Sequence, residues 1–150
     1  MHPVITLSDP REPQASALLR SSHNLMESLF PPEDNHFLSI EALCRPDILF
    51  VTARQSGQVL GCGALMIREG YGELKSMFTT PPARGRGIAA AVLNRLEDEA
   101  RKQGMSAIRL ETGDLLHEAH RLYARHGFQL CEPFGDYEEN PSSIFMEKWL

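Results

Sequence analysis

The sequence predicts a mixed α/β fold, with a mostly antiparallel central sheet, one parallel pair of strands and flanking helices. Two stretches with β-branched residues and a period of two, 48–53 and 59–67, follow one another across a glycine turn and predict an antiparallel hairpin. Later in the chain the pattern becomes strand, helix, strand, helix, strand. That order adds a parallel segment to the antiparallel strands.

In the first part of the chain, Val4–Leu7 is expected to form a short strand. Residues 8–10 offer a cap before an amphipathic helix, which the two prolines at 31–32 end. A second short helix is expected over 36–44, before Pro46. The first half is therefore predicted as two helices followed by an antiparallel meander.

In the second part, a turn at 70–72 leads into a third meander strand over Glu73–Thr79. Glycines near the ends of both following helices suit left-handed caps. The expected elements after that strand are a long helix behind Pro81-Pro82, a strand at 107–112, a helix at 115–126 and a last strand at 143–149.

Length and composition indicate one globular domain over 1–150, because about 150 residues, 42% of them hydrophobic, suffice for a core. There is no internal repeat and no linker. No run of 18 apolar residues occurs, and the beginning of the chain lacks the pattern of a signal peptide. These features predict a cytoplasmic protein that does not enter a membrane.

The net charge of −5 argues against nucleic-acid binding, which draws its affinity from basic residues, and favours a small-molecule partner. The three cysteines, Cys44, Cys62 and Cys131, are odd in number and far apart. We expect them to be buried free thiols in a reducing compartment, without a nucleophilic role.

The most informative stretch is 84–89, a glycine-bearing loop between a strand and a helix. Unpaired backbone N–H groups and the positive end of the helix dipole meet there, so an anion can bind. Gly85 and Gly87 allow close backbone approach, and Arg84 and Arg86 add positive charge. The loop therefore predicts a phosphate site; the alternative is a helix that simply starts with glycines.

A dinucleotide fingerprint, Gly85-x-Gly87-x-x-Ala90, is a weaker reading of the same residues. That fingerprint needs an apolar strand directly before the first glycine and an acidic residue about 20 positions later. Residues 81–84 intervene here, and 101–106 contain no acid. A Walker loop is excluded as well, because no Gly-Lys-Ser/Thr follows.

Arg84-x-x-Gly87-x-Ala89, placed after a strand that ends in Met77-Phe78-Thr79, resembles the acetyl-CoA loop of the GCN5-related N-acetyltransferase (GNAT) superfamily. A second element, Ala119-x-x-Leu122-Tyr123-x-x-x-Gly127-Phe128, is similar to a later helix and tyrosine pattern of that superfamily. The strings at 73–75 and 110–113 resemble a bacterial subgroup of small acetyltransferases.

The resemblance implies a V-shaped opening between the third meander strand and the parallel strand at 107–112, which would hold pantetheine. The cosubstrate would be acetyl-CoA, with no metal ion. Alanine at 89 lies within the family pattern, whereas Leu116 replaces an asparagine of many relatives. The cofactor-binding residues carried over by the resemblance are Met77, Phe78, Thr79, Arg84, Gly85, Arg86, Gly87, Ile88 and Ala89.

The resemblance also assigns catalytic roles. Tyr123 would donate a proton to the CoA sulfur; the alternative is a tyrosine that merely packs in the helix. A backbone N–H near Met77 or Phe78 would polarise the thioester carbonyl. Glu73 or Glu111 would take the proton of the amine, unless the enzyme selects an amine that is already neutral.

The histidines do not form a zinc motif, because His117 and His120 are one residue too close for His-Glu-x-x-His. By the resemblance, the N-terminal helix pair would complete the acceptor pocket. That pair and the loop at 134–137 could wall off a pocket. A set of side chains there suits a cationic amine, the alternative being a solvated connection between helices: His23, Glu27, Glu33, Asp34 and His36.

These arguments predict an acetyl-CoA-dependent N-acetyltransferase that acts on the amine of a small or amino-acid-like acceptor. Two alternatives stay open, a protein or peptide N-acetyltransferase and a non-catalytic acyl-CoA-binding module. The oligomeric state also stays open, with a homodimer among the alternatives.

Overall fold

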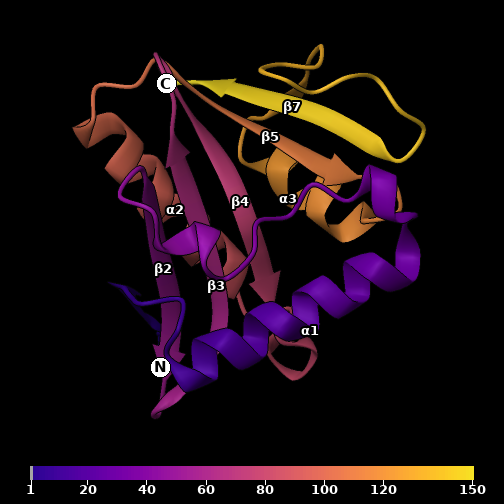
Figure 1. Cartoon of the computed structure of the whole chain (residues 1–150). Helices are drawn as coiled ribbons and strands as arrows, with labels where there is room; N and C mark the ends of the chain where they lie inside the picture. The colour runs from indigo at the N-terminus through magenta and orange to yellow at the C-terminus, as the bar shows by residue number, and fades with distance from the viewer. Residues whose placement is uncertain (1) are drawn as a thin grey trace.

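The computed structural model describes residues 2–150 and contains a seven-stranded sheet with helices on both faces (Figure 1). Short 3-10 turns lie at 32–34, 42–44 and 81–83. In chain order the other elements are β1 (Val4–Leu7), α1 (Pro13–Leu29), β2 (Ile48–Gln55), β3 (Gln58–Ile67), β4 (Tyr71–Thr79), α2 (Ile88–Lys102), β5 (Ala107–Gly113), α3 (His117–Arg125), β6 (Gln129–Leu130) and β7 (Ser143–Trp149).

The strands lie in the order β1-β2-β3-β4-β5-β7-β6, and every neighbouring pair is antiparallel except β4 and β5. The crossover between these two strands runs through α2, as a parallel connection requires. This arrangement confirms the predicted fold class.

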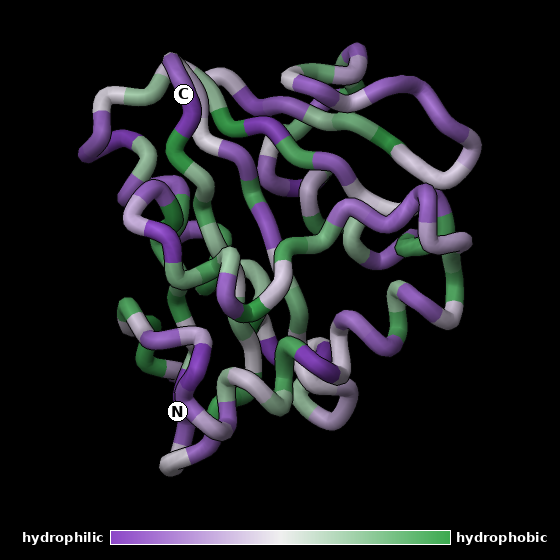
Figure 2. Tube along the Cα trace, viewed as in Figure 1, coloured by the Kyte–Doolittle hydropathy of each residue, from purple (hydrophilic) through white to green (hydrophobic). Residues whose placement is uncertain are grey.

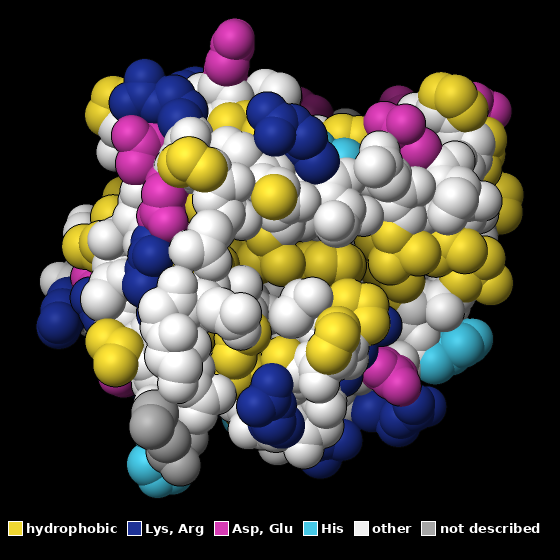
Figure 3. Space-filling model, turned by 90° about the horizontal axis from the view of Figure 1, so that it is seen from below, with side chains coloured by type: hydrophobic (Ala, Val, Ile, Leu, Met, Phe, Trp, Pro, Cys, Tyr) yellow, Lys and Arg dark blue, Asp and Glu magenta, His cyan; other side chains and the backbone are white. Residues whose placement is uncertain are grey.

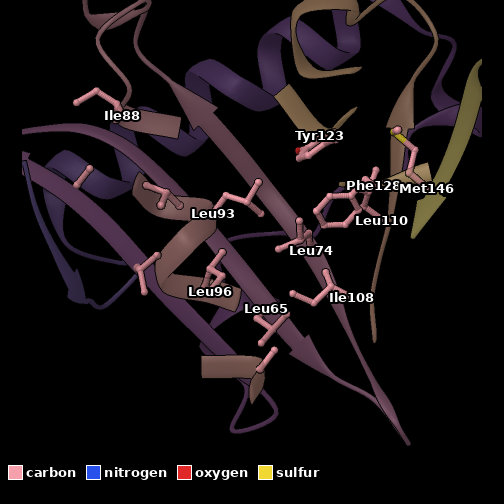
Figure 4. Packing of buried hydrophobic residues seen from close by; sticks show 14 of the residues in the cluster. Leu65, Leu74, Ile88, Leu93, Leu96, Ile108, Leu110, Tyr123, Phe128 and Met146 are labelled. Carbon is pink, nitrogen blue, oxygen red and sulfur yellow. The ribbon is translucent and has the colours of Figure 1, made fainter. Parts of the chain in front are cut away.

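Two hydrophobic clusters fill the two faces of the sheet. One cluster joins α2 and α3 to the sheet, with Leu65, Leu93 and Tyr123 among its members (Figure 4). The other joins α1 to the opposite face, around Leu19 and Met66. Hydrophilic and hydrophobic segments alternate along α1 (Figure 2), as expected for a helix with one buried face.

The parallel pairing between β4 and β5 is short, and this leaves an opening between the two strands. Pairing between β4 and β5 runs only from Tyr71 with Ala107 to Leu74 with Leu110. Beyond that point β4 continues along β3 while β5 continues along β7, so the two strands separate (Figure 1). The V-shaped opening implied by the family resemblance is therefore present.

Most predicted elements are confirmed to within two residues, and the last strand starts and ends where the sequence placed it. The predicted helix over 36–44 is wrong, and the first half holds one helix. Only a 3-10 turn lies at 42–44, because the segment before it packs against the core without forming a helix. Leu38 and Ile40 contact the cluster beneath α1, and the carbonyl of His36 accepts a hydrogen bond from Lys75.

Smaller differences concern the second half and the cysteines. The helix expected over 115–126 begins at His117, because Leu116 closes a turn onto the carbonyl of Gly113. Of the three free thiols, Cys62 is buried, and its pKa is raised to about 12 by burial. Cys44 is exposed and Cys131 is partly exposed, which corrects the expectation that all three are buried.

Candidate functional site: the opening between β4 and β5

The loop at the start of α2 has the geometry of an anion site. Gly85 and Gly87 have φ values of 81° and 78°, a left-handed conformation that favours glycine. Gly87 caps α2 without any side-chain hydrogen bond to the first turn. A Cβ built on either glycine meets nothing within 4 Å, so the backbone faces open space. These features fit a pyrophosphate held by backbone N–H groups.

The arginines of this loop are exposed, but one of them is held by β4. The Arg84 Nε donates a hydrogen bond to the carbonyl of Thr79, 3.1 Å away, and its guanidinium lies over the ring of Phe78. Arg86 makes no hydrogen bond or ion pair within residues 2–150 and stays exposed. Its charge is available to a bound anion.

The second half of β4 offers a free backbone edge. Phe78 and Thr79 pair with β3 on one side, and from residue 75 onward β4 has no strand partner on the other. Ser76 has a φ of 56°, and the pairing with β3 shifts register beside it. Such a bulge leaves residues of β4 out of the ladder with β3 and increases the local twist of the strand.

A cleft of about 120 Å³ lies in the opening, between β4, β5, α1 and α3. Seen from below, hydrophobic side chains gather in a band across the centre of the molecule (Figure 3). The predicted residues Tyr123, Glu111 and Met77 line this cleft, as does Leu116. Its other walls include Ser22, Met26 and Phe30 from α1, Lys75 and Ser76 from β4, and Thr112 and Gly113 from β5.

Tyr123 projects from α3 into the cleft and is only 5% exposed. Its ring packs against Phe128 (Figure 4). Its hydroxyl makes no hydrogen bond within residues 2–150. Burial, with the nearby charge of Glu111, raises the pKa of this hydroxyl. A protonated donor is thus placed where it can reach a bound group.

Glu111 stands on β5, on the opposite wall from β4. Its Oε2 accepts a hydrogen bond of 2.7 Å from the Ser143 hydroxyl on β7. Burial raises the pKa of the Glu111 carboxyl, and the Ser143 hydrogen bond and the charges of His36 and Lys75 partly oppose this effect. A carboxylate with a raised pKa accepts protons more readily than an exposed one.

Glu73, the other predicted base candidate, has different surroundings. It is 1% exposed, and its Oε2 accepts a hydrogen bond of 2.5 Å from Tyr137 and lies 3.1 Å from the Lys75 ammonium. It does not line the cleft that holds Tyr123 and Glu111. The structure therefore separates the two carboxylates that the sequence placed together.

Glu73 instead lines a second cavity of about 430 Å³, rich in acidic side chains. His36 and Asp34 line both the cavity and the cleft, so the two spaces adjoin. His23 and Glu27, which the sequence grouped with them, line neither space. The carboxylates of the cavity are Glu33, Asp34, Glu73, Asp136, Glu138 and Glu139, and Arg68 is its one cation.

Sequence reasoning missed two residues of this region, Lys75 and Tyr137, as functional side chains. In the sequence, Lys75 belongs to the string at 73–75 that resembles the acetyltransferase subgroup, and Tyr137 belongs to the loop at 134–137 that is expected to wall the pocket. Nothing in the spacing shows that a lysine on β4 meets a tyrosine 62 positions later, with 2.6 Å between Nζ and hydroxyl. Residues 2–150 hold no cluster of three or more His, Cys, Asp or Glu side chains arranged for a metal ion.

Comparison with known proteins agrees with this geometry. A model of the acetyltransferase (GNAT) family matches residues 17–128. An IAA acetyltransferase of Azospirillum brasilense is 44% identical, over 98% of this chain and 97% of its own length. A crystal structure of a candidate acyl-CoA N-acyltransferase from Klebsiella pneumoniae subsp. pneumoniae MGH 78578 superposes with a TM-score of 0.83 at 33% identity, covering 99% of this chain and 97% of that one.

The fold also recurs at lower identity. The PaiA N-acetyltransferase of Thermoplasma acidophilum, whose crystal structure contains coenzyme A, has a TM-score of 0.76 at 19% identity, with all of both chains covered. The fold is that of the acyl-CoA N-acyltransferases. The chain belongs to the GNAT family and is an N-acetyltransferase. No helix within residues 2–150 is long and apolar enough to cross a membrane.

Proposed function

We propose that the protein transfers the acetyl group of acetyl-CoA to the amine of a small or amino-acid-like acceptor by direct attack. The observation that supports this most is the cleft itself. The glycine loop of α2 lies at the end of β4, and Tyr123 and Glu111 line the opening that this strand borders. An acyl donor bound along β4 would present its thioester between these two side chains.

The proposed roles follow from what the reaction needs. The attacking amine must lose a proton, and Glu111, which lines the cleft together with one other carboxylate, Asp34, can take it. The thiolate that departs must gain a proton, and the buried Tyr123 hydroxyl can supply it. A backbone N–H of β4 near Met77 or Phe78 would polarise the thioester carbonyl.

The charge of the adjoining cavity supports a cationic acceptor. Its walls carry six carboxylates and one guanidinium, that of Arg68, and only one of the six, Glu73, is also paired with the Lys75 ammonium. Such a field raises the local concentration of protonated amines and disfavours anionic acceptors. The route past Asp34 and His36 would bring the amine to the cleft.

A panel of amines tests the proposal. Acetyl-CoA is incubated with the protein and with amino acids, diamines or a lysine-containing peptide, and thiol release is followed together with the product mass. We expect an acetylated small amine. Acetylation of the peptide alone, or thiol release without an acetylated amine, would overturn the proposed acceptor class.

Glu111→Gln tests the assigned base with the acceptor found in that panel. The amide keeps the size of the side chain and can still accept from Ser143, but it has little proton affinity. Turnover should fall by roughly 10²–10⁴-fold and recover partly at high pH, where more of the amine is neutral. An unchanged rate across the pH range would remove Glu111 from the mechanism.

A further inference from the structure

Lys75 and Glu111 stand where the parallel pair of strands ends. They follow Leu74 and Leu110, the last residues that β4 and β5 pair. Leu74 and Leu110 both belong to the core cluster beneath α2, so the alternation along a strand turns Lys75 and Glu111 to the opposite face. Both then line the cleft, one from each arm of the V.

The ammonium group of Lys75 is fixed by three partners from three segments. It donates hydrogen bonds to the Tyr137 hydroxyl at 2.6 Å and to the His36 carbonyl at 3.1 Å, and it lies 3.1 Å from Glu73 Oε2. Two of the three donors of the ammonium are thus used in hydrogen bonds, and the Glu73 carboxylate balances its charge as an ion pair. With 9% exposure, Lys75 is a buried cation in a defined position.

We propose that Lys75 is a positioning residue for proton removal: its fixed ammonium holds the neighbouring Glu111 carboxylate in the charged form that accepts the proton of the amine. The proposal rests on the function proposed above, in which Glu111 is the base. Lys75 does not touch the reacting atoms in this scheme and acts through Glu111 alone.

The electrostatic surroundings of Glu111 support this role. Burial raises the pKa of Glu111, whereas the Ser143 hydrogen bond, His36 and Lys75 lower it, and Glu73 raises it again. Without Lys75, burial and the charge of Glu73 would raise the pKa of Glu111 further, because less positive charge would oppose them. The charged, titratable or hydrogen-bonding groups around this carboxyl come from the 34–36 segment, β4, α3 and β7: Asp34, His36, Glu73, Lys75, Tyr123 and Ser143.

A Lys75 that merely stabilised the fold would give a different result from one that tunes Glu111. Lys75→Met removes the cation and leaves Glu73, so the titration midpoint of Glu111 should rise. Glu73→Gln removes the anion and leaves Lys75, so the midpoint should fall. Both variants break the same buried ion pair. Loss of structure alone would not shift the titration midpoint of Glu111 up in one variant and down in the other.

The experiment is a pH titration of Glu carboxyl ¹³C resonances, with the full-length protein saturated with coenzyme A. The resonance that disappears in Glu111→Gln identifies Glu111. We expect the midpoint to move to higher pH in Lys75→Met, to lower pH in Glu73→Gln and to stay near the wild-type value in Lys75→Arg. Tyr137→Phe loosens the network without changing a charge, so it is the matched control and should leave the midpoint in place.

A double variant, Glu73→Gln with Lys75→Met, covers the case in which Lys75→Met does not fold, because it leaves no unpaired buried charge. Its midpoint should lie above that of Glu73→Gln alone, because only the double variant lacks the Lys75 cation. A midpoint at or below that of Glu73→Gln would overturn the proposal, as would a midpoint that Lys75→Met leaves unmoved.

The kinetic readout separates this proposal from the proposed function. With an acceptor from the amine panel, Lys75→Met should lower kcat/KM roughly tenfold on the acidic side and approach the wild-type rate at high pH. If Glu111→Gln keeps the wild-type rate, the proposed function of Glu111 fails. If Glu111→Gln loses activity but Lys75→Met leaves the pH profile unmoved, only the role of Lys75 fails.

Discussion

The ring of Phe30 lies directly over Gly113, so a Cβ added to this glycine would stand 2.2 Å from Cζ of the ring. Phe30 follows the last residue of α1, and Gly113 is the last residue of β5. Both line the cleft. The end of α1 is therefore fitted to β5 at the acceptor side, and the absence of a side chain at 113 is what allows the contact.

Gly113→Ala should displace Phe30 and change the cleft. The added methyl group overlaps a ring that is 7% exposed, so we expect a loss of about 1–3 kcal/mol in the free energy of unfolding. The KM for the acceptor should rise, with little change in CoA affinity. Phe30→Leu in the same chain frees space and should recover part of the lost stability; additive losses in a double-mutant cycle would contradict the contact.

Gly87→Val should abolish CoA binding, because a β-branched side chain would strain the left-handed backbone and block approach to its N–H groups. Wild-type protein with CoA at ~100 times its Kd should gain about 2.7 kcal/mol. A thermal-shift assay measures both effects, and NAD should give no shift.

Gly104→Val is the matched control for that variant. Gly104 has a φ of 74° and open space around its Cβ position, like Gly87, but it lies beyond the C-terminal end of α2. The strain cost of both variants should be similar, about 1–3 kcal/mol. If CoA still stabilises Gly104→Val but not Gly87→Val, the loop at 84–89 is responsible for CoA binding. If both variants lose the thermal shift with CoA, the loss comes from destabilisation of the fold.

Local pattern was sufficient for most of the fold and for the anion loop. Strand alternation, the prolines at 31–32 and the glycines at 104 and 127 act within a few residues, and the structure has left-handed glycines at both positions. The loop at 84–89 is likewise predicted from residues within the loop itself. The prediction of a helix over 36–44 is wrong because the conformation of this segment depends on distant partners. The main one is the Lys75 ammonium, which donates a hydrogen bond to the His36 carbonyl.

The candidate site shows the same division. Tyr123 and Glu111 were identified from motifs, and the structure brings them to one cleft. Glu111 and Glu73 cannot be told apart from the sequence, because both lie in strand patterns of a similar kind. What separates them is the partner set: Glu73 meets Lys75 and Tyr137, whereas Glu111 accepts from Ser143. Those contacts join residues from 2 to 64 positions apart.

Tyr123→Phe tests the proposed proton donor. The ring and its packing on Phe128 remain, and the lost hydroxyl has no hydrogen-bond partner among residues 2–150, so stability should change little. Turnover should fall by roughly 10²–10⁴-fold, with the CoA thermal shift unchanged. Tyr71→Phe, on β4 but outside the cleft, is the matched control and should keep its rate. Equal rates for both variants would leave Tyr123 a packing residue.

Glu111→Gln should stabilise the protein at neutral and alkaline pH, although it impairs turnover. Because the pKa of Glu111 is higher in the folded chain than in the unfolded chain, the folded chain binds more protons between the two values. This carboxyl therefore lowers the free energy of unfolding as the pH rises through that window, and the full loss is present above the folded-state pKa. The neutral amide avoids the loss and can still accept from Ser143.

Denaturant unfolding of wild-type protein and Glu111→Gln across pH measures this difference. The variant should be the more stable protein at pH 8, and the gap should close as the pH falls below the unfolded-state pKa, near 4.3. Glu147→Gln, on β7 and paired with Arg109 of β5, is a suitable comparison because it should not gain stability at pH 8. A gap that persists unchanged in acid would mean that Gln at 111 stabilises the fold by packing, and that the buried charge of Glu111 carries no cost.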